Sequence, residues 1–579
     1  MRSIWARLSA GVPPKTSGGG SAAGKPAAAP VASPSAYPDW PQLLGADWPR
    51  WQAALAQAGA EPAVLLATSV GGHAPTAILE SLLAVALTLR GARVHILLCD
   101  ESLPACLQAS LTPDFPPARY AANGPQRIWC SSCFRPAEAM FRALGVEVHR
   151  LSELIQPEER RAARQTAASL PAADILGYST GGIRQGEHAL AGTLRYFARG
   201  DLAGEPQQEP ILRRYFEAAL LTTYAATRLL REQAIRSVSV SHGIYVPFGV
   251  VCDVARREAV PVSTWNTAYR KHCVIFSHGD TYHHTMLTEP TESWEGLPWN
   301  AELEAPLMRY LTSRSQGQND WIKFNANAQE DLGPAVAALG VDFARPCIGL
   351  LTNVVWDAQL MYEGNAFSGM VEWVLESVRY FARRPELHLI IRAHPGEVRG
   401  TLPSRQPILD EIHREFPILP PNVFLIPPES DISTYAMMDR CNAVLIYATK
   451  TGVELASQGM PVIVAGEAWV RNKGITLDAT SPAEYFALLD QLPLPARMSP
   501  AQTRRARMYA YHFFFRRMIP LPMLEPTGTY PPFRLALAGL DDLRPGASPG
   551  LDIICDGLLN GAPFVFPAEH YAPESEPAA

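Results

Sequence analysis

The sequence predicts an α/β protein, and three patterns favour this class. Apolar runs of strand length alternate with helical patterns through the second half of the chain. The first half opens with a strand, helix and strand pattern. The whole chain has 579 residues, which allows two large domains. No run of about 18 uncharged apolar residues, the length that crosses a bilayer, occurs in the sequence.

The two ends of the chain differ in composition from the rest. Residues 1–38 are dominated by Gly, Ser, Ala and Pro, which bury too little apolar surface to fold, so a disordered extension is expected. They lack the apolar stretch of a secretory signal. Residues 567–579 are expected to form a flexible acidic tail.

The first expected domain begins with a βαβ pattern. The apolar run AVLLATS at 63–69 precedes the helical pattern at 78–90 and a second apolar run at 92–100. Gly71 and Gly72 lie in the turn, where backbone amides can approach a ligand, although turn chemistry alone explains them. Two later strand candidates lie within 236–249 and 259–266.

The second half predicts a doubly wound parallel sheet. Five apolar runs alternate with helical patterns: 347–354, 387–395, 422–428, 442–449 and 461–466. Ligands of such sheets bind beyond the carboxyl ends of the strands, so the residues after each run are the candidates for a site. The expected division is a disordered extension at 1–38, an N-terminal α/β domain at 39–325 and a C-terminal Rossmann-like domain at 326–500. A crossing helix and extension at 501–566 and a flexible tail at 567–579 complete the chain.

One candidate site follows the second of these runs, which ends in Arg392, Ala393, His394 and Pro395. Proline fixes the exit from the strand, and the flanking polar residues invite a ligand. The alternative is a surface ion pair or a cap.

A second candidate site follows the fourth run. Thr449, Lys450, Thr451 and Gly452 open a helix, so hydroxyls, an ammonium and helix amides converge there and favour a phosphate. The alternative is an ordinary threonine cap. Glu454 in the first turn is expected to contact a ribose hydroxyl, although the helix dipole alone explains a carboxylate at that position.

A basic loop follows the fifth run and presents Gly466, Arg471, Lys473, Gly474 and Thr476. Two alternatives are predicted for Arg471 and Lys473: they are solvated surface charges, as is usual for a basic loop, or they close over phosphates.

Three segments of this half, RAHP at 392–395, YATKTGVELASQGMPVIVAG at 447–466 and KGITLDATSPAEY at 473–485, carry a family resemblance. Residues 345–520 resemble the bacterial capsule polysaccharide biosynthesis family, which includes Kdo-transferring capsule enzymes. The resemblance is weaker through 241–249 and 263–270. It implies a GT-B glycosyltransferase, in which two Rossmann-like domains face a cleft.

The resemblance also implies ligands. His394, Pro395, Thr449 and Thr451 match positions expected to hold the cytidine monophosphate of a nucleotide-sugar donor, with CMP-Kdo as the leading donor. Many retaining GT-B enzymes carry two glutamates around the donor phosphates, but this chain has Ile446 at the position of the first one ahead of Glu454, so it is not expected to belong to that group. The chain also has no DxD triplet, the motif that binds the metal and diphosphate in the other large transferase fold. A metal-independent reaction without a cofactor is therefore expected, because helix amides and basic side chains can stabilise the departing phosphate.

A catalytic base is less visible in the sequence. His242, in the turn after the strand candidate SVSVS, is the best candidate for the acceptor hydroxyl, and His73 and His278 are weaker ones. The alternative for His242 is a turn residue whose ring bonds to the backbone.

Four cysteines of the first half, Cys99, Cys106, Cys130 and Cys133, include one CxxC pair. Reduced, buried thiols are the expectation, and a structural zinc site is the alternative.

The segment 504–518 contains five arginines and five aromatic residues. We expect it to form a helix that crosses back to the first domain, with its aromatic residues in the core. The alternative is contact with an anionic membrane surface, where a lipid-linked acceptor lies.

The charge balance narrows the partners. The sum of 50 Lys and Arg against 56 Asp and Glu is −6, which disfavours nucleic acid. The expected partners are a nucleotide sugar and a glycan or lipid-linked acceptor, in the cytoplasm, with the inner-membrane surface or a capsule assembly complex as further candidates. A UDP-sugar 2-epimerase and a non-catalytic capsule-assembly subunit remain alternative functions.

Overall fold

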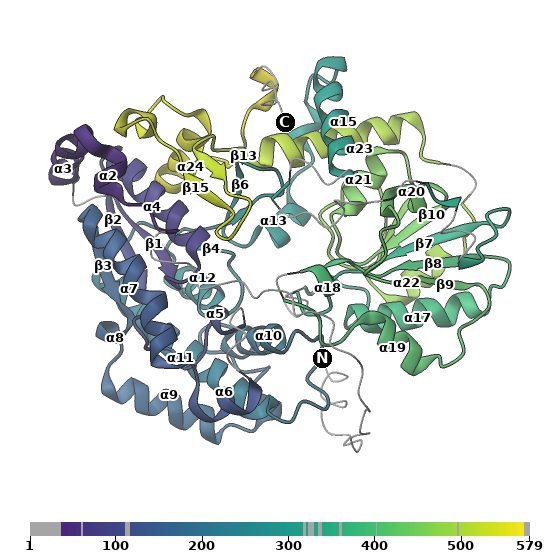
Figure 1. Ribbon diagram of the computed structural model, residues 1–579, viewed down its shortest axis with the longest axis horizontal. Coiled ribbons are helices and arrows are strands. Elements are labelled where there is room, and N and C mark those ends of the chain that lie inside the picture. The colour runs from purple at the N-terminus through teal and green to yellow at the C-terminus, as the bar shows by residue number, and fades with distance from the viewer. Residues whose placement is uncertain are drawn as a thin grey trace. The chain divides into compact units, whose positions relative to one another are not determined.

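The computed structural model describes residues 36–59, 62–110, 116–315, 320–321, 329, 331–333, 339–357, 362–400, 402–494 and 497–571. They form two compact units, and each is built around a set of parallel strands (Figure 1). The first unit contains the described residues up to Trp265 together with 278–281 and 522–562. The second contains 266–277, 282–521 and the described residues from Pro563. Two sheets layered with helices confirm the predicted α/β class.

The first unit is built on parallel strands in the order β5, β4, β1, β2, β3. The strands are β1 Ala63–Ser69, β2 Arg93–Leu98, β3 Glu147–Arg150, β4 Ser237–Ser241 and β5 Val262–Thr267. The chain winds outward from β1 to β3 and then returns to place β4 on the other side of β1. The strand order therefore reverses between β1 and β4, as in a doubly wound sheet.

Helices surround this sheet. They are α2 Trp40–Leu44, α3 Trp48–Gln57, α4 Ala74–Thr88, α5 Leu107–Ser110, α6 Pro117–Asn123, α7 Arg127–Leu144, α8 Leu151–Leu154, α9 Pro157–Ser169, α10 Gln185–Phe197, α11 Gln208–Glu232, α12 Phe248–Arg257 and α24 Pro549–Asn560. Every residue of α4 is buried, which matches its apolar sequence on all sides. Helix α24 and the hairpin of β14 Leu524–Pro526 and β15 Phe533–Leu535 contact α4, so the end of the chain completes its cover.

A single acidic side chain, Glu80, lies within this buried helix. Its carboxylate accepts hydrogen bonds from Thr68 Oγ1 at 2.5 Å and from Trp265 Nε1 at 3.0 Å. Burial raises the pKa of Glu80 to about 7, against 4.5 in water, although both hydrogen bonds oppose the shift. The folded protein therefore binds this proton more tightly than the unfolded chain does.

The pH dependence of stability tests this description of Glu80. Because the folded-state pKa is the higher one, the stabilising contribution is complete below pH 4.5 and is lost as the pH rises to about 7. Two and a half pKa units correspond to at most about 3 kcal/mol. We expect the wild-type free energy of unfolding to fall over this range relative to that of Glu80→Gln, which cannot ionise. Parallel curves for the two proteins in urea denaturation would contradict the assignment.

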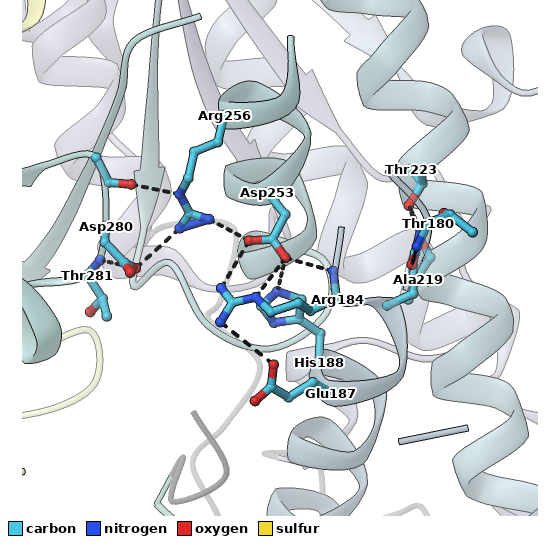
Figure 2. A network of polar contacts seen from close by, with 12 residues as sticks. Thr180, Arg184, Glu187, His188, Ala219, Thr223, Asp253, Arg256, Asp280 and Thr281 are labelled. Atoms are coloured by element: carbon cyan, nitrogen blue, oxygen red, sulfur yellow. Dashed lines mark hydrogen bonds and ion pairs between the residues drawn. The ribbon is translucent and has the colours of Figure 1, made fainter. Parts of the chain in front are cut away.

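A buried ionic network ties α10 to α12 (Figure 2). Asp253, whose side chain is 2% exposed, accepts from Arg184 Nη2 at 3.1 Å and lies 3.1 Å from His188 Nε2. Arg256 pairs with Asp253 and reaches Asp280 at 3.2 Å. Although burial raises it, the pKa of Asp253 is held well below its usual range by these partners. The carboxylate thus stays charged among its partners.

The second unit contains six parallel strands in the order β9, β8, β7, β10, β11, β12. They are β7 Cys347–Leu351, β8 His388–Arg392, β9 Val423–Ile426, β10 Ala443–Ile446, β11 Val462–Val464 and β12 Leu477–Asp478. The five predicted runs form β7 to β11, and this is the order of a doubly wound nucleotide-binding sheet. Its strand order reverses between β7 and β10, where ligands of such sheets bind.

Alternation along the strands fills a core on each face of the second sheet. Ile348 and Leu350 pack with Trp373 in one core, whereas Leu351 and Ile446 belong to the other. Helices α17, α19 and α22 lie on one side of this sheet and α20 and α21 on the other (Figure 1). Both faces are therefore covered, as the continuous apolar runs require.

The helices of the second unit begin with α13 Tyr282–Thr288, α14 Glu292–Glu295 and α15 Ala301–Ser315. After β7 come α17 Met370–Ala382, α18 Gly396–Arg399, α19 Ile408–Glu415, α20 Thr434–Asp439, α21 Thr451–Ser457, α22 Pro482–Leu489 and α23 Pro500–Tyr511. Strand β6 Cys273–His278 pairs in antiparallel fashion with β13 Ile519–Pro520. No helix in the described part of the chain is long and apolar enough to cross a membrane.

The aromatic and arginine-rich segment 504–518 lies within the second unit. Helix α23 continues into a π-helical turn at His512–Arg517, and Tyr509, Phe513 and Phe514 are fully buried. Four of the five arginines pair with carboxylates of the same unit, including Arg517 with Glu289 at 2.8 Å. The aromatic residues are therefore core, as expected. The chain passes to the first unit only after this helix, at residue 522.

Three segment boundaries differ from those expected. Of the extension at 1–38, residues 1–35 lie outside the described residues, but Tyr37 is buried and donates to Gly71 O at 2.8 Å. Of the tail, 572–579 lie outside the described residues, whereas Ala568–His570 forms a 3₁₀ turn and Glu569 pairs with Arg516 at 3.1 Å. Residues 282–315, expected before the boundary at 325, pack in the second unit because their aromatic and aliphatic side chains join its core.

Candidate functional site

Three loops meet at the carboxyl edge of the second sheet, beside the point where its strand order reverses. Thr352 and Asn353 follow β7, and they tie the other two loops together. Thr352 Oγ1 accepts from the backbone N–H of His394 at 3.0 Å, in the loop after β8. Asn353 Nδ2 donates to Ala448 O at 3.1 Å, in the loop after β10. These bonds fix the relative positions of the candidate residues in the second unit.

His394 lies in this junction in a defined protonation state. Its Nδ1 accepts the backbone N–H of Gly396 at 3.0 Å, a turn that Pro395 shapes as the N-cap of α18. Burial, with Lys450 and Arg392 nearby, lowers the pKa of His394 to about 4. The ring is therefore neutral at neutral pH and carries its proton on Nε2, which makes Nε2 a hydrogen-bond donor.

Thr449, Lys450, Thr451 and Gly452 follow β10, as predicted. Thr449 Oγ1 bonds to Thr451 Oγ1 at 3.2 Å, and Lys450 Nζ lies 4.6 Å from the centre of the Tyr269 ring. A Cβ on Gly452 would lie 2.5 Å from Ile446 Cδ1 and 3.1 Å from Val470 Cγ1, so a larger residue would require these side chains to move where the helix begins against the strand. Because α21 has only seven residues, the lysine is the main positive charge of this turn.

Glu454 is fully engaged by protein groups. Its Oε1 pairs with Arg314 Nη2 at 3.1 Å and with Lys450 Nζ at 3.3 Å, and Tyr435 donates to Oε2. Although burial raises it, the pKa of Glu454 is lowered to about 2 by Arg314 and Lys450. The expected ribose contact does not fit a carboxylate that is 1% exposed and bonded on both oxygens. The geometry gives Glu454 a positioning role toward Lys450.

Arg314 is held in turn by Asp320, which also accepts from Tyr310 Oη at 2.8 Å. Burial, followed by the Arg314 cation, lowers the pKa of the Lys450 ammonium. The cluster thus contains two cations and two carboxylates, and an anionic ligand near Lys450 would meet a balanced rather than a strongly positive group.

Three other predicted cations are structural. Arg392 donates to Pro427 O and to Ser430 O at 2.9 Å, and Arg471 donates to Gly364 O at 2.6 Å. Lys473 Nζ donates to Glu289 O at 3.0 Å and is 1% exposed. Because Arg471 and Lys473 are buried with their donors on backbone carbonyls, the expected phosphate loop is not supported.

Of the candidate histidines of the first unit, His73 and His242 lie in loops after strands, and His278 is the last residue of β6. His242 follows β4 with φ of +66°, and its backbone N–H donates to Trp265 O at 2.8 Å. His73 Nδ1 lies 2.6 Å from Thr76 Oγ1, and burial lowers its pKa to about 4. His278 lies 2.8 Å from Ala562 O through Nε2, which is a structural contact. His242 remains a proposal as a base, supported by a strained backbone beside a reversal of strand order.

The four cysteines do not assemble as a metal site. In the described part of the chain, the group of three metal-ligand side chains with atoms mutually within 4.8 Å is His95, Glu147 and His149, without a cysteine. Cys133 Sγ instead accepts the backbone N–H of Gly72 at 2.9 Å, which also removes this amide from the ligand role considered for the turn. Burial raises the pKa of Cys99 to about 12, so this thiol is protonated in the structure.

Sequence patterns missed several residues of the site. Thr352 and Asn353 lie inside the predicted run 347–354, and because β7 ends at Leu351 they are in fact the first residues after the strand, where the rule that selected His394 applies. Arg314 and Asp320 carry no such signal, because they lie in and after α15, before the second sheet begins.

Known proteins with a similar sequence or structure were compared with this chain. No curated protein matches the chain. Two solved structures among those that match are a Thermosulfurimonas dismutans KpsC, a beta Kdo 2,4 transferase, and a UDP-GlcNAc 2-epimerase from Neisseria meningitidis bound to UDP-GlcNAc. The first shows 13% identity and a TM-score of 0.33 over 48% of this chain and 80% of that chain. The second shows 13% identity and a TM-score of 0.26 over 77% and 94%.

A family model matches with defined limits. Residues 344–495 match the model of the capsule polysaccharide biosynthesis protein family, which confirms the predicted resemblance over that range. The match begins just before β7 and ends after α22, so it contains the six strands of the second sheet, the three loops and His394. The second sheet and its candidate site are therefore similar to those of capsule polysaccharide biosynthesis proteins.

Proposed function

We propose that this protein is a glycosyltransferase that builds a capsule or other surface polysaccharide, or its lipid anchor, from a nucleotide sugar. The observation that carries the proposal is the family match over 344–495, which contains the whole second sheet with its three junction loops. A doubly wound sheet binds nucleotides at the reversal of strand order, and His394 and Lys450 lie in the loops there.

The residues have separate roles in this proposal. The Nε2–H of His394 and the turn at Pro395 contact the nucleotide. Thr449 and Thr451 offer hydroxyl donors to the phosphate, and Lys450 supplies a cation for the charge that develops as the phosphate departs. Glu454 holds Lys450 in place, and Arg314 in turn holds Glu454.

The finer assignments follow the family resemblance. CMP-Kdo is the donor we propose, the acceptor is a glycan or a lipid-linked sugar, and the reaction needs no metal because Lys450 and the hydroxyls act on the phosphate. His242 of the first unit is the proposed base for the acceptor hydroxyl. We place the protein in the cytoplasm, at the inner-membrane surface when its acceptor is lipid-linked.

Ligand-dependent stability tests the donor site directly. Melting temperatures of the purified protein are measured with CMP, UDP, GDP and their sugar conjugates. A nucleotide at 100 times its Kd stabilises the folded protein by about 2.7 kcal/mol, which is a measurable shift. We expect CMP and CMP-Kdo to raise the melting temperature of the wild type and to leave that of His394→Ala unchanged.

The matched control is His413→Ala, because His413 is exposed on α19, away from the three loops. It should keep the full CMP shift. Stabilisation by UDP-sugars alone would overturn the proposed donor, and no shift with any nucleotide would favour a non-catalytic assembly subunit.

A further inference from the structure

Two histidines and a glutamate converge on neighbouring strands of the first unit, outside the sites considered above. His95 Nδ1 and His149 Nε2 are 2.9 Å apart. The carboxylate of Glu147 lies 3.7 Å from His95 Nδ1 and 3.6 Å from His149 Nε2. The two rings stack with centroids 5.1 Å apart. In the described residues these are the three metal-ligand groups whose atoms lie mutually within 4.8 Å.

The sheet itself brings these side chains together. Strands β2 and β3 run parallel, and His95 is the register partner of Glu147. Residues two apart on a strand point to the same face, so Glu147 and His149 share one face with His95 beside them. The arrangement therefore depends on the register of the two strands and not on a flexible loop.

Burial of the cluster is graded. The side chain of His95 is 2% exposed, that of His149 12% and that of Glu147 37%, so an ion can enter from the carboxylate side. An imidazole with its ordinary pKa of about 6.5 is largely neutral at neutral pH, and the neutral form is the one that binds metals.

We propose that His95, Glu147 and His149 form a zinc site that joins the edge strand β3 to β2. Two ligand atoms on a tetrahedral zinc ion are about 3.4 Å apart, given bonds of about 2.1 Å. The distance of 2.9 Å between His95 Nδ1 and His149 Nε2 is shorter than that value, and the distances of 3.7 Å and 3.6 Å from these nitrogens to Glu147 Oε2 and Oε1 are slightly longer. Two imidazoles and one carboxylate suit zinc, whereas calcium and magnesium prefer oxygen ligands. A water molecule completes the four ligands.

A competing interaction makes the proposal testable. Arg93 Nη2 donates to Glu147 Oε2 at 2.6 Å, and both side chains are partly exposed. Such an exposed pair contributes little to stability, so Glu147 can turn from Arg93 to a metal ion at small cost. The alternative explanation of the cluster is a hydrogen bond between His95 and His149 beside that ion pair.

The cluster lies along the strands and not in the loops after them, where ligands of doubly wound sheets bind. The ion therefore has a structural role, and this inference does not depend on the proposed transferase activity. Its binding should raise the stability of the first unit, in which β3 lies at the edge of the sheet.

The experiment is a zinc titration of the full-length protein after removal of metal with a chelator. Bound zinc is counted by mass spectrometry, and the melting temperature is followed during the titration. We expect one zinc ion per chain and a rise in melting temperature. Glu147→Gln, and separately His149→Gln, should weaken zinc binding at least about tenfold, because each removes a ligand.

The matched control is Arg93→Gln, which removes the same ion pair as Glu147→Gln but keeps all three ligands. It should bind zinc at least as tightly as the wild type, because a competing cation is gone. Absence of zinc binding, equal affinity in Glu147→Gln, or an equal loss in Arg93→Gln would overturn the proposal. Circular dichroism establishes that each variant is folded, and cobalt in place of zinc reports a tetrahedral site by its absorption.

Discussion

Replacing Lys450 with methionine is expected to lower kcat for sugar transfer by about 100-fold or more while the protein remains folded. The ammonium is the main cation in the turn after β10. Helix α21 has only seven residues, so its dipole is too weak to replace this charge. Glu454 keeps its bonds to Arg314 and Tyr435 in this variant, so the cluster beneath the site persists. Steady-state kinetics with the nucleotide-sugar donor measure the effect.

Two further variants separate the role of Lys450 from a general loss of charge. Lys450→Arg keeps the cation and should recover part of the activity. Arg440→Gln removes a positive charge of an exposed residue at the end of α20, before β10 begins, and should leave kcat unchanged. If Lys450→Met retained full activity, or if Arg440→Gln lost as much, Lys450 would not act on the donor phosphate.

Replacing Asp253 with asparagine is expected to destabilise the first unit by about 3 kcal/mol. The substitution leaves Arg184, Arg256 and His188 beside a neutral amide in a place where Asp253 is 2% exposed (Figure 2). A cation that loses its buried partner keeps its desolvation cost, so the loss exceeds that of an ordinary surface pair. Urea denaturation of the wild type and the variant gives the difference.

Asp280→Asn is the control for this prediction. Asp280 pairs with the same Arg256 at 3.2 Å, but its side chain is 33% exposed. Its loss should cost less than about 1 kcal/mol, because water screens the pair. Equal effects of the two substitutions would show that burial does not set the strength of this network.

The sequence patterns located most of the second sheet. Each apolar run from 347 to 466 became a strand, because a parallel sheet covered on both faces needs continuous apolar segments. The segment 282–315 was harder to assign, because helices before a sheet carry no signal for the core that they join. The aromatic residues of 504–518 were expected in the core at helical spacing, and Tyr509 and Phe513 are there.

The positions of some residues of the candidate site could be predicted from the sequence, whereas the contacts of others could not. Side chains that directly follow a strand, such as His394 and Lys450, were found because strand ends in a parallel sheet share an edge. The sequence did not predict the roles of Arg471, Lys473 and Glu454. A sequence pattern does not show whether a charged side chain contacts solvent, a backbone carbonyl or another charge. Lys473 donates to a backbone carbonyl and Glu454 joins a buried ion pair, and both contacts depend on residues distant in sequence.

The most direct test of the proposed function is the release of CMP from CMP-Kdo, measured with and without a capsule glycan acceptor. The account predicts CMP release that depends on the acceptor in the wild type and falls strongly in His394→Ala. Conversion of a UDP-sugar to its 2-epimer without any acceptor would contradict it, as would the absence of turnover with every nucleotide sugar.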